Sequence, residues 1–174
     1  MLWSRRHAVA AMGSVLALAA CGFQPLYGRR SDDDRSLVEM AAIDVLPVPD
    51  RIGQILRNEL SDRLTPRGVP AVPRYRLGVS MSRSREGLAI ERDESATRIN
   101  LTVRVSYRLM DAASGDVLTN GIVRAVAAFN VVQSEFANIA AENDAEARAA
   151  RDVSEEIRNR LGVYFSQSLR GGHS

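Results

Sequence analysis

Hydrophobic and polar positions alternate with a period of two through the middle of the chain. From Ile99 to Leu109 every odd-numbered position is apolar, and every even-numbered position is polar or charged. Because successive side chains of a strand point to opposite faces of a sheet, this pattern predicts a half-buried strand. A shorter stretch with the same alternation, from Tyr75 to Met81, predicts a second strand before it.

Two further segments are predicted to be strands. Residues 42–46 form a short apolar run that Pro47 and Pro49 bring to an end. A turn over residues 111–116, rich in turn-forming aspartate, serine and glycine, leads into a strand predicted over 117–131. The register of this last strand stays open, because both of its sides are partly apolar and both could be covered. Ile122 and Val126 lie on one side, and Val123, Ala125, Ala127 and Phe129 on the other.

Two segments have apolar positions spaced three and four residues apart, which is typical of amphipathic helices. The first follows Asp50, a residue type that caps helices, and the turn formers of residues 65–68 end it. The second begins near Ser134 and ends at Gly171 and Gly172. Its predicted apolar stripe consists of Phe136, Ile139, Ala140, Asn143, Ala147, Ala150, Val153, Ile157, Leu161, Tyr164 and Phe165.

The predicted elements follow the order β-α-β-β-β-α, which favours the α+β class. Strands with one apolar face need helices on that face only. We therefore expect a single open mixed or antiparallel sheet of about four strands, with two helices packed on one face. The helix between the first two strands predicts a parallel crossover, and the remaining strands predict an antiparallel meander. The other face of the sheet is left polar.

The N-terminus has the parts of an export signal. Arg5 and Arg6 give it a positive start, residues 8–17 form an apolar run, and Leu18-Ala19-Ala20 leads into Cys21. The apolar run is too short to span a bilayer, which takes about 20 apolar residues. The tetrapeptide at its end resembles the lipobox of bacterial lipoproteins, in which the cysteine is acylated and becomes the first residue of the mature chain.

The alternative is an ordinary secretory signal cut after Ala20, which would leave a free thiol. Cys21 is the single cysteine of the sequence, so in an oxidising compartment it would have no disulfide partner in its own chain. Acylation explains both the position and the isolation of this residue. We therefore expect a membrane anchor through lipid on Cys21.

The composition then suggests how the chain is organised. Residues 1–20 are the predicted lipoprotein signal peptide, which is removed, and residues 21–36 are a lipidated tether that offers little to bury. Residues 37–170 are long enough for one α+β domain with its own core, and residues 171–174 are a tail.

The charge balance changes once the signal is removed. The whole sequence has 23 basic and 21 acidic residues, and the signal contains two arginines and no acid, so the mature chain has 21 of each. A net charge near zero gives no reason to expect nucleic acid as a partner. All basic side chains are arginine, whose guanidinium can bind phosphate or carboxylate through two parallel hydrogen bonds.

Arginines are concentrated between residues 74 and 108, a stretch that contains eight arginines and only four acids. A hairpin would bring Arg83 and Arg85 on one arm, and Arg92 and Arg98 on the other, to one end of the sheet. Several guanidiniums could converge there on phosphate groups. In the alternative interpretation these arginines line a solvated sheet face and pair with acids across strands, each pair contributing little.

The reactive side chains argue against an enzyme. His7 is lost with the signal, His173 lies in the tail, and Cys21 is committed to lipid. The predicted domain therefore has no histidine that could act as the base for a catalytic serine or cysteine, or that could bind zinc. We expect no metal and no cofactor. A hydrolase using two carboxylates is the remaining alternative. Its candidates are Glu91, Asp93 and Glu94 in one connection, and Asp111 and Asp116 in a turn, where such acids usually serve the turn itself.

The sequence Cys21-Gly22-Phe23-Gln24-Pro25-Leu26-Tyr27-Gly28 resembles the opening of mature LptE lipoproteins of alphaproteobacteria. The strand containing residues 98–103 and the long C-terminal helix match that family as well. The resemblance implies an outer-membrane lipoprotein that sits as a plug inside the β-barrel of LptD, helps that barrel assemble and contacts lipopolysaccharide. An accessory lipoprotein of another envelope transporter, or a pilot for a secretin, is the alternative that shares the tether and the small α+β domain.

Overall fold

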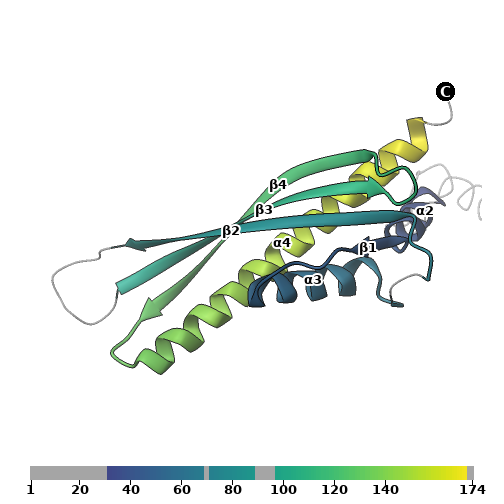
Figure 1. Cartoon of the computed structure of the whole chain (residues 1–174). Helices are drawn as coiled ribbons and strands as arrows, with labels where there is room; N and C mark the ends of the chain where they lie inside the picture. Colours follow the sequence, from purple (N-terminus) through teal and green to yellow (C-terminus); the bar gives the residue numbers. More distant parts are fainter. Residues whose placement is uncertain (1–30, 69–70, 89–96, 172–174) are drawn as a thin grey trace, which may run out of the picture. The chain divides into compact units, whose positions relative to one another are not determined.

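The computed structural model describes residues 31–68, 71–88 and 97–171 (Figure 1). Its elements follow the predicted order, with one helix added at the start, and from Asp32 onward they form one compact unit. They are α2 (Ser31–Met40), β1 (Ile43–Val45), α3 (Arg51–Leu64), β2 (Tyr75–Leu88), β3 (Thr97–Asp111), β4 (Val117–Val131) and α4 (Glu135–Gly171).

The four strands form one open sheet in the order β1-β2-β3-β4. β1 runs parallel to β2, with Ile43 opposite Tyr75, and α3 forms the crossover between them. β2, β3 and β4 pair in antiparallel fashion as a meander. The predicted α+β sheet with a parallel crossover is therefore confirmed, and β2 extends seven residues beyond the alternation that ended at Met81.

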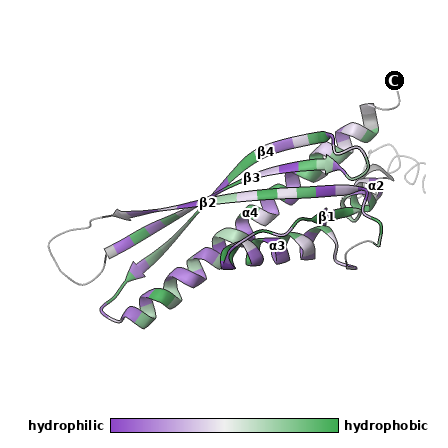
Figure 2. Ribbon diagram, viewed as in Figure 1, coloured by the Kyte–Doolittle hydropathy of each residue, from purple (hydrophilic) through white to green (hydrophobic). Residues whose placement is uncertain are grey.

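The core lies between the sheet and the helices α3 and α4, which cover the same face (Figure 1). Along β3 the odd-numbered residues face this core, and Leu101, Val103, Val105 and Leu109 have no exposed surface. Even-numbered neighbours such as Arg104 and Ser106 are exposed on the open face. Figure 2 shows the resulting alternation of hydrophobic and hydrophilic residues along the strands.

The pairing of β4 with β3 decides which side of β4 faces the core. Val123 lies opposite Val105 and Ala125 opposite Val103, so the odd-numbered side of β4 joins the core. Ile122 and Val126 lie on the other side and remain about half exposed, at 55% and 47%. Only the helix-facing side of this strand is buried among the described residues, because α4 crosses that side.

β4 is an edge strand, and two arginines of α4 bind its outer edge. The guanidinium of Arg148 donates a hydrogen bond to the carbonyl of Ala128 over 3.1 Å, and that of Arg160 donates one to the carbonyl of Ile122, also over 3.1 Å. An unpaired strand edge is a template for pairing with another chain, and occupied carbonyls reduce that tendency.

The structure differs from two expectations near the N-terminus of the domain. The helix α2 begins at Ser31, inside the segment assigned to the tether, and Ser36 within it is buried. Helix α3 does follow Asp50, but the side chain of this residue makes no capping hydrogen bond and its backbone has a φ of 70°. The first turn of α3 is therefore held by packing of Ile52 into the core and not by a side-chain cap.

The start of α4 is less buried than its apolar stripe predicted. Phe136 is 83% exposed and Ile139 is 54% exposed, whereas Val153, Ile157 and Leu161 have no exposed surface. The buried side of this part of α4 runs through Ala141, Ala145 and Ala149, so the N-terminal half of the predicted stripe lies off that side and the prediction is wrong there. The first turns of α4 also extend beyond α3 (Figure 1). An amphipathic stripe is buried only as far as a partner surface extends.

Candidate functional site: the arginine-rich end of the sheet

The four arginines singled out in the sequence do not form one cluster. Arg83 lies opposite Val103 in the β2–β3 pair and Arg85 opposite Leu101, so both arginines share the face that carries the core. Arg98 is an even-numbered residue of β3 and lies on the opposite, open face. Arg92 lies outside the described residues. The expected convergence of Arg83, Arg85 and Arg98 is therefore wrong, because a strand sends alternate residues to opposite faces.

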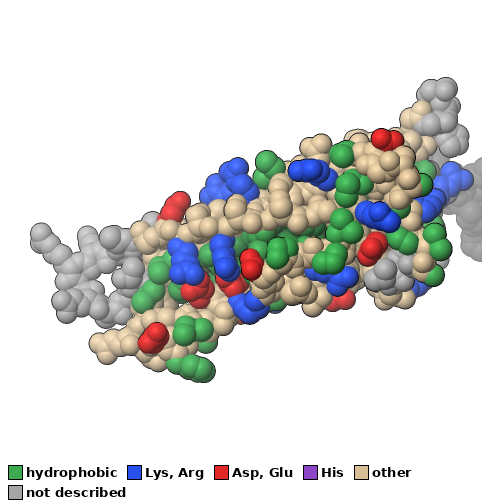
Figure 3. Space-filling model, viewed as in Figure 1, with side chains coloured by type: hydrophobic (Ala, Val, Ile, Leu, Met, Phe, Trp, Pro, Cys, Tyr) green, Lys and Arg blue, Asp and Glu red, His purple; other side chains and the backbone are tan. Residues whose placement is uncertain are grey.

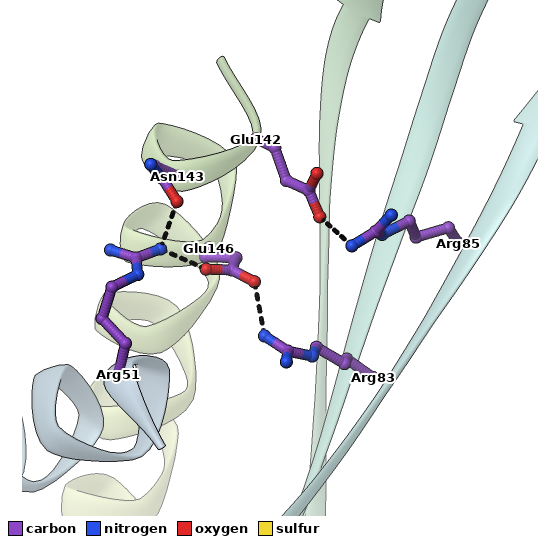
Figure 4. Close-up of polar contacts among 6 residues, drawn as sticks. All are labelled: Arg51, Arg83, Arg85, Glu142, Asn143 and Glu146. Carbon is purple, nitrogen blue, oxygen red and sulfur yellow. Dashed lines mark hydrogen bonds and ion pairs between the residues drawn. The ribbon is translucent and has the colours of Figure 1, made fainter. Parts of the chain in front are cut away.

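Arg83 and Arg85 pair with acids of α4 that lie opposite them across the helix-facing side. The guanidinium of Arg83 is 2.7 Å from Glu146, and that of Arg85 is 2.5 Å from Glu142. The second carboxylate oxygen of Glu146 accepts a hydrogen bond from Arg51 of α3, which also donates to the side-chain oxygen of Asn143 (Figure 4). Glu146 thus joins α3, α4 and β2.

Glu146 is the least exposed ion-pair partner in this group. Its side chain is 5% exposed, while those of Arg51 and Arg83 are 53% and 45% exposed. No buried side-chain nitrogen or oxygen in the described part of the chain lacks a hydrogen-bond partner. A buried carboxylate is tolerated only when it is paired and hydrogen-bonded, and Glu146 meets that condition through two arginines. Figure 3 shows basic and acidic side chains close together between the strands and the start of α4.

The sequence analysis did not single out Glu146 and Glu142, the two acids of α4 that pair with these arginines. The sequence of β2 could have indicated these pairs. Its odd-numbered positions Leu77, Val79 and Met81 are apolar, and the next two odd-numbered positions on the same side are Arg83 and Arg85. Cationic residues on a core-facing side require acidic partners. Acids spaced four residues apart on the helix that packs there could supply them.

We expect Glu146→Gln to lower the free energy of unfolding by about 1–2 kcal/mol, because both charge-assisted hydrogen bonds lose their anion while the two arginines remain partly solvated. Glu155→Gln is the matched control, since Glu155 is exposed on the same helix and makes no ion pair among the described residues. Urea unfolding monitored by circular dichroism measures both variants. Equal midpoints for the two variants would show that the network around Glu146 contributes no stability.

The open face of the sheet presents a second group of arginines. Arg104 of β3 and Arg124 of β4 lie directly opposite each other, a like-charge pair that destabilises a sheet unless an anion joins it. They line a shallow depression of about 240 Å³ together with Ser82, Ser84 and Thr102, whose hydroxyls can donate hydrogen bonds. Arg83 and Glu86 of β2 line it as well. Guanidiniums beside hydroxyls suit a phosphate or a carboxylate.

The arginines of this open face share one further property. Within the part of the chain that the structure describes, none of them forms an ion pair with an acid. The group consists of Arg76, Arg98, Arg104, Arg108 and Arg124. The expectation that sheet arginines pair with acids across strands is therefore wrong for this face.

Of the two turn acids, Asp111 has a structural role. The carboxylate of Asp111 accepts hydrogen bonds from the backbone N–H groups of Ser114 and Ala113, each over 2.9 Å, and these bonds lower the pKa of Asp111. This matches the turn chemistry expected for such residues. Glu91, Asp93 and Glu94 lie outside the described residues.

Two features are absent from the described residues. No group of three or more histidine, cysteine, aspartate or glutamate side chains is placed to hold a metal ion among residues 31–68, 71–88 and 97–171. Over the same residues, no helix combines the length and the apolar character needed to cross a membrane.

Comparison with known proteins adds the following. A family model described as LptE, lipopolysaccharide-assembly, matches residues 38–161. A crystal structure described as a lipoprotein from Caulobacter crescentus CB15 has a TM-score of 0.67 at 22% identity, over 77% of this chain and 98% of that chain. A minor lipoprotein from Acinetobacter baumannii has a TM-score of 0.52 at 18% identity, over 70% and 90%. Both likenesses are in the fold. Among curated proteins there is no significant match.

Proposed function

The chain belongs to the LptE family of lipopolysaccharide-assembly lipoproteins, and on that premise we propose that it assists assembly of the LptD β-barrel, plugs it and helps deliver lipopolysaccharide to the outer membrane. The observation that carries the proposal is the family match over residues 38–161, which includes all four strands and most of α4. In this proposal the protein is not an enzyme. It is anchored at the outer membrane through lipid on Cys21, with its domain on the periplasmic side, within or below the barrel.

The open face of the sheet is the surface that we propose for lipopolysaccharide. Its arginines make no ion pair among the described residues, and Arg104 and Arg124 meet beside three hydroxyl side chains. The phosphates of lipid A are anions of the class that such a group binds. Arg98, one of the four arginines singled out in the sequence, lies on this face as well. Arg92 remains a candidate contact at the hairpin.

Arg83 and Arg85 have a different place in the proposal. Both side chains are about half exposed, at 45% and 58%, although they are paired with Glu146 and Glu142. We propose that their main contribution is to hold α4 against β2 and thereby keep the hairpin in position. Direct contact with lipopolysaccharide or with the barrel is the secondary role.

We expect the double variant Arg104→Ala/Arg124→Ala to bind lipopolysaccharide at least about ten-fold more weakly, because two charge-assisted contacts to phosphate are lost. The remaining binding should depend less on salt concentration. The thermal midpoint should stay within a few degrees, since both side chains are exposed. The measurement uses the mature chain with Cys21→Ala, titrated with lipopolysaccharide, and Arg151→Ala on the exposed side of α4 is the control.

The outcome separates three cases. Weakened binding in the double variant and not in the control supports the proposed surface. Full binding combined with failure to co-purify a barrel from outer membranes assigns the open face to the barrel partner instead. If neither property changes, these arginines form a solvated surface. Co-purification of a barrel other than LptD, such as a secretin, would favour the pilot-lipoprotein alternative.

A further inference from the structure

Helix α2 lies at the end of the sheet away from the paired residues Leu88 and Arg98 (Figure 1), and a groove lies beside this helix. It consists of two adjoining hollows of about 440 and 430 Å³, which share Leu37, Met40 and Arg158. One hollow extends toward the C-terminal turn of α3 at residues 63–68, and the other toward α4 around Val163.

The groove exposes aliphatic side chains that a domain of this size would normally bury. Leu37, Val38 and Val163 are 49%, 63% and 54% exposed. Met40 and Leu64 form the buried part of the lining, at 6% and 2% exposure, and connect it to the core. An apolar patch that continues inward in this way and is rimmed by polar residues is typical of an interaction site.

The charged side chains that line the groove among the described residues are all basic. Arg63, Arg67 and Arg158 line it, and no acid is found among the described residues that line either hollow. Arg63 is paired with Glu59 on its own helix. Within the described part of the chain, Arg67 and Arg158 form no ion pair. An apolar floor with an arginine rim suits a molecule with a hydrocarbon chain and an anionic head.

Helix α2 is fixed in place and cannot simply collapse into the groove. Its Glu39 accepts a hydrogen bond from the hydroxyl of Tyr75 over 2.8 Å and an ion pair from Arg74 over 2.7 Å. Burial, followed by the hydrogen bond to Glu39, raises the pKa of Tyr75 to about 12. The ring of Tyr75 in turn packs on Phe165 of α4, with centroids 5.2 Å apart. The apolar side chains of α2 therefore stay exposed beside the groove.

We propose that this groove binds an anionic phospholipid of the membrane to which the protein is attached, with an acyl chain along Leu37, Val38 and Val163 and the phosphate beside Arg67 and Arg158. The proposal rests on the proposed function in one respect, the lipid on Cys21. Ser31 comes ten positions after Cys21, and a chain of that length spans at most about 35 Å when fully extended. Such an anchor keeps α2 close to the bilayer surface. The groove then gives the domain a second, weak membrane contact that sets its orientation.

The test uses the mature chain with Cys21→Ala, so that the lipid anchor does not dominate. Flotation is measured with phosphatidylcholine vesicles and with vesicles of equal parts phosphatidylcholine and phosphatidylglycerol. We expect binding only to the anionic vesicles, weakened by salt. Arg67→Ser/Arg158→Ser should weaken it by at least about ten-fold, since each basic residue near an anionic surface contributes roughly a five-fold effect. Leu37→Ser/Val38→Ser should weaken it comparably.

Matched controls lie elsewhere on the domain. Val132→Ser and Val117→Ser replace aliphatic residues of similar exposure, 46% and 51%, and Arg151→Ser replaces an exposed arginine of α4. These variants should bind the anionic vesicles like the unsubstituted chain. Because all substituted side chains other than Arg158 are exposed, and Arg158 is partly so, circular dichroism should show intact folding throughout.

Several results would overturn the proposal. Equal binding by groove variants and controls would show that the groove does not hold lipid, and so would absence of binding to anionic vesicles. A groove-dependent dimer in sedimentation would assign the groove to a second copy of the chain. If groove variants lose lipopolysaccharide binding while phospholipid binding never occurs, the groove belongs to the lipopolysaccharide site. None of these results affects the test of lipid on Cys21, which is read from the mass of the mature N-terminus.

Discussion

Val103→Asp should leave the domain unfolded at room temperature. Val103 has no exposed surface and lies in the middle of β3, under α4 and next to Ala125. An aspartate there would bury a second carboxylate beside Arg83, whose guanidinium is already paired with Glu146, and its other neighbours are aliphatic. We expect a cost of more than about 4 kcal/mol, a large part of the stability of a typical domain. Circular dichroism and one-dimensional NMR of the purified variant measure the loss of structure.

The neighbouring residue supplies the control. Thr102 lies on the open face of the same strand and lines the polar depression, so Thr102→Asp should change the free energy of unfolding by only about 1 kcal/mol. The pair of variants tests which residues face the helices. Equal tolerance of aspartate at both positions would contradict the register in which Val103 lies opposite Ala125 and Arg83.

Cys21→Ala is expected to move nearly all of the protein from the membrane fraction to the soluble fraction. Two or more acyl chains hold a protein stably at a bilayer, whereas a single weak contact such as the α2 groove gives only marginal binding. The fractionation is done with a high-salt wash, which screens arginine contacts. A strain without the barrel partner serves as background, because a barrel could retain the protein without lipid.

A second measurement makes the same test independent of fractionation. Mass spectrometry of the wild-type protein should show a mature chain that starts at Cys21 and carries the mass of its acyl groups. A wild-type chain without lipid at this residue would contradict lipidation. Membrane retention of Cys21→Ala in the absence of the barrel would do so as well.

The elements of this fold could be predicted from the sequence because each rests on a local pattern. The period of two over residues 99–109 determines which side chains of β3 face the core, and the predicted bounds of β4 agree with Val117–Val131. Turn formers after residue 64 end α3 at Leu64. Strand and helix periods act over a few residues, so they are readable without knowledge of the tertiary structure.

The arginine-rich end of the sheet could be predicted only in part. Local sequence predicts a concentration of arginines on two neighbouring strands, but not which arginine meets which partner. Arg83 and Arg98 looked equivalent in the sequence, although one pairs with a buried acid of α4 and the other lies on the open face. Arg104 and Arg124 lie opposite each other because of the register between β3 and β4. That register cannot be predicted from the local sequence of either strand.

The sequence by itself determined the order of the elements, the polar face of the sheet and the resemblance of residues 21–28 to LptE lipoproteins. Only the tertiary structure decided which side of β4 is buried, why Phe136 is exposed and why Glu146 is not. The physical reason is the same in each case. A side chain is buried when another element covers it, and which element covers β4, Phe136 or Glu146 depends on where α3 and α4 pack along the sheet.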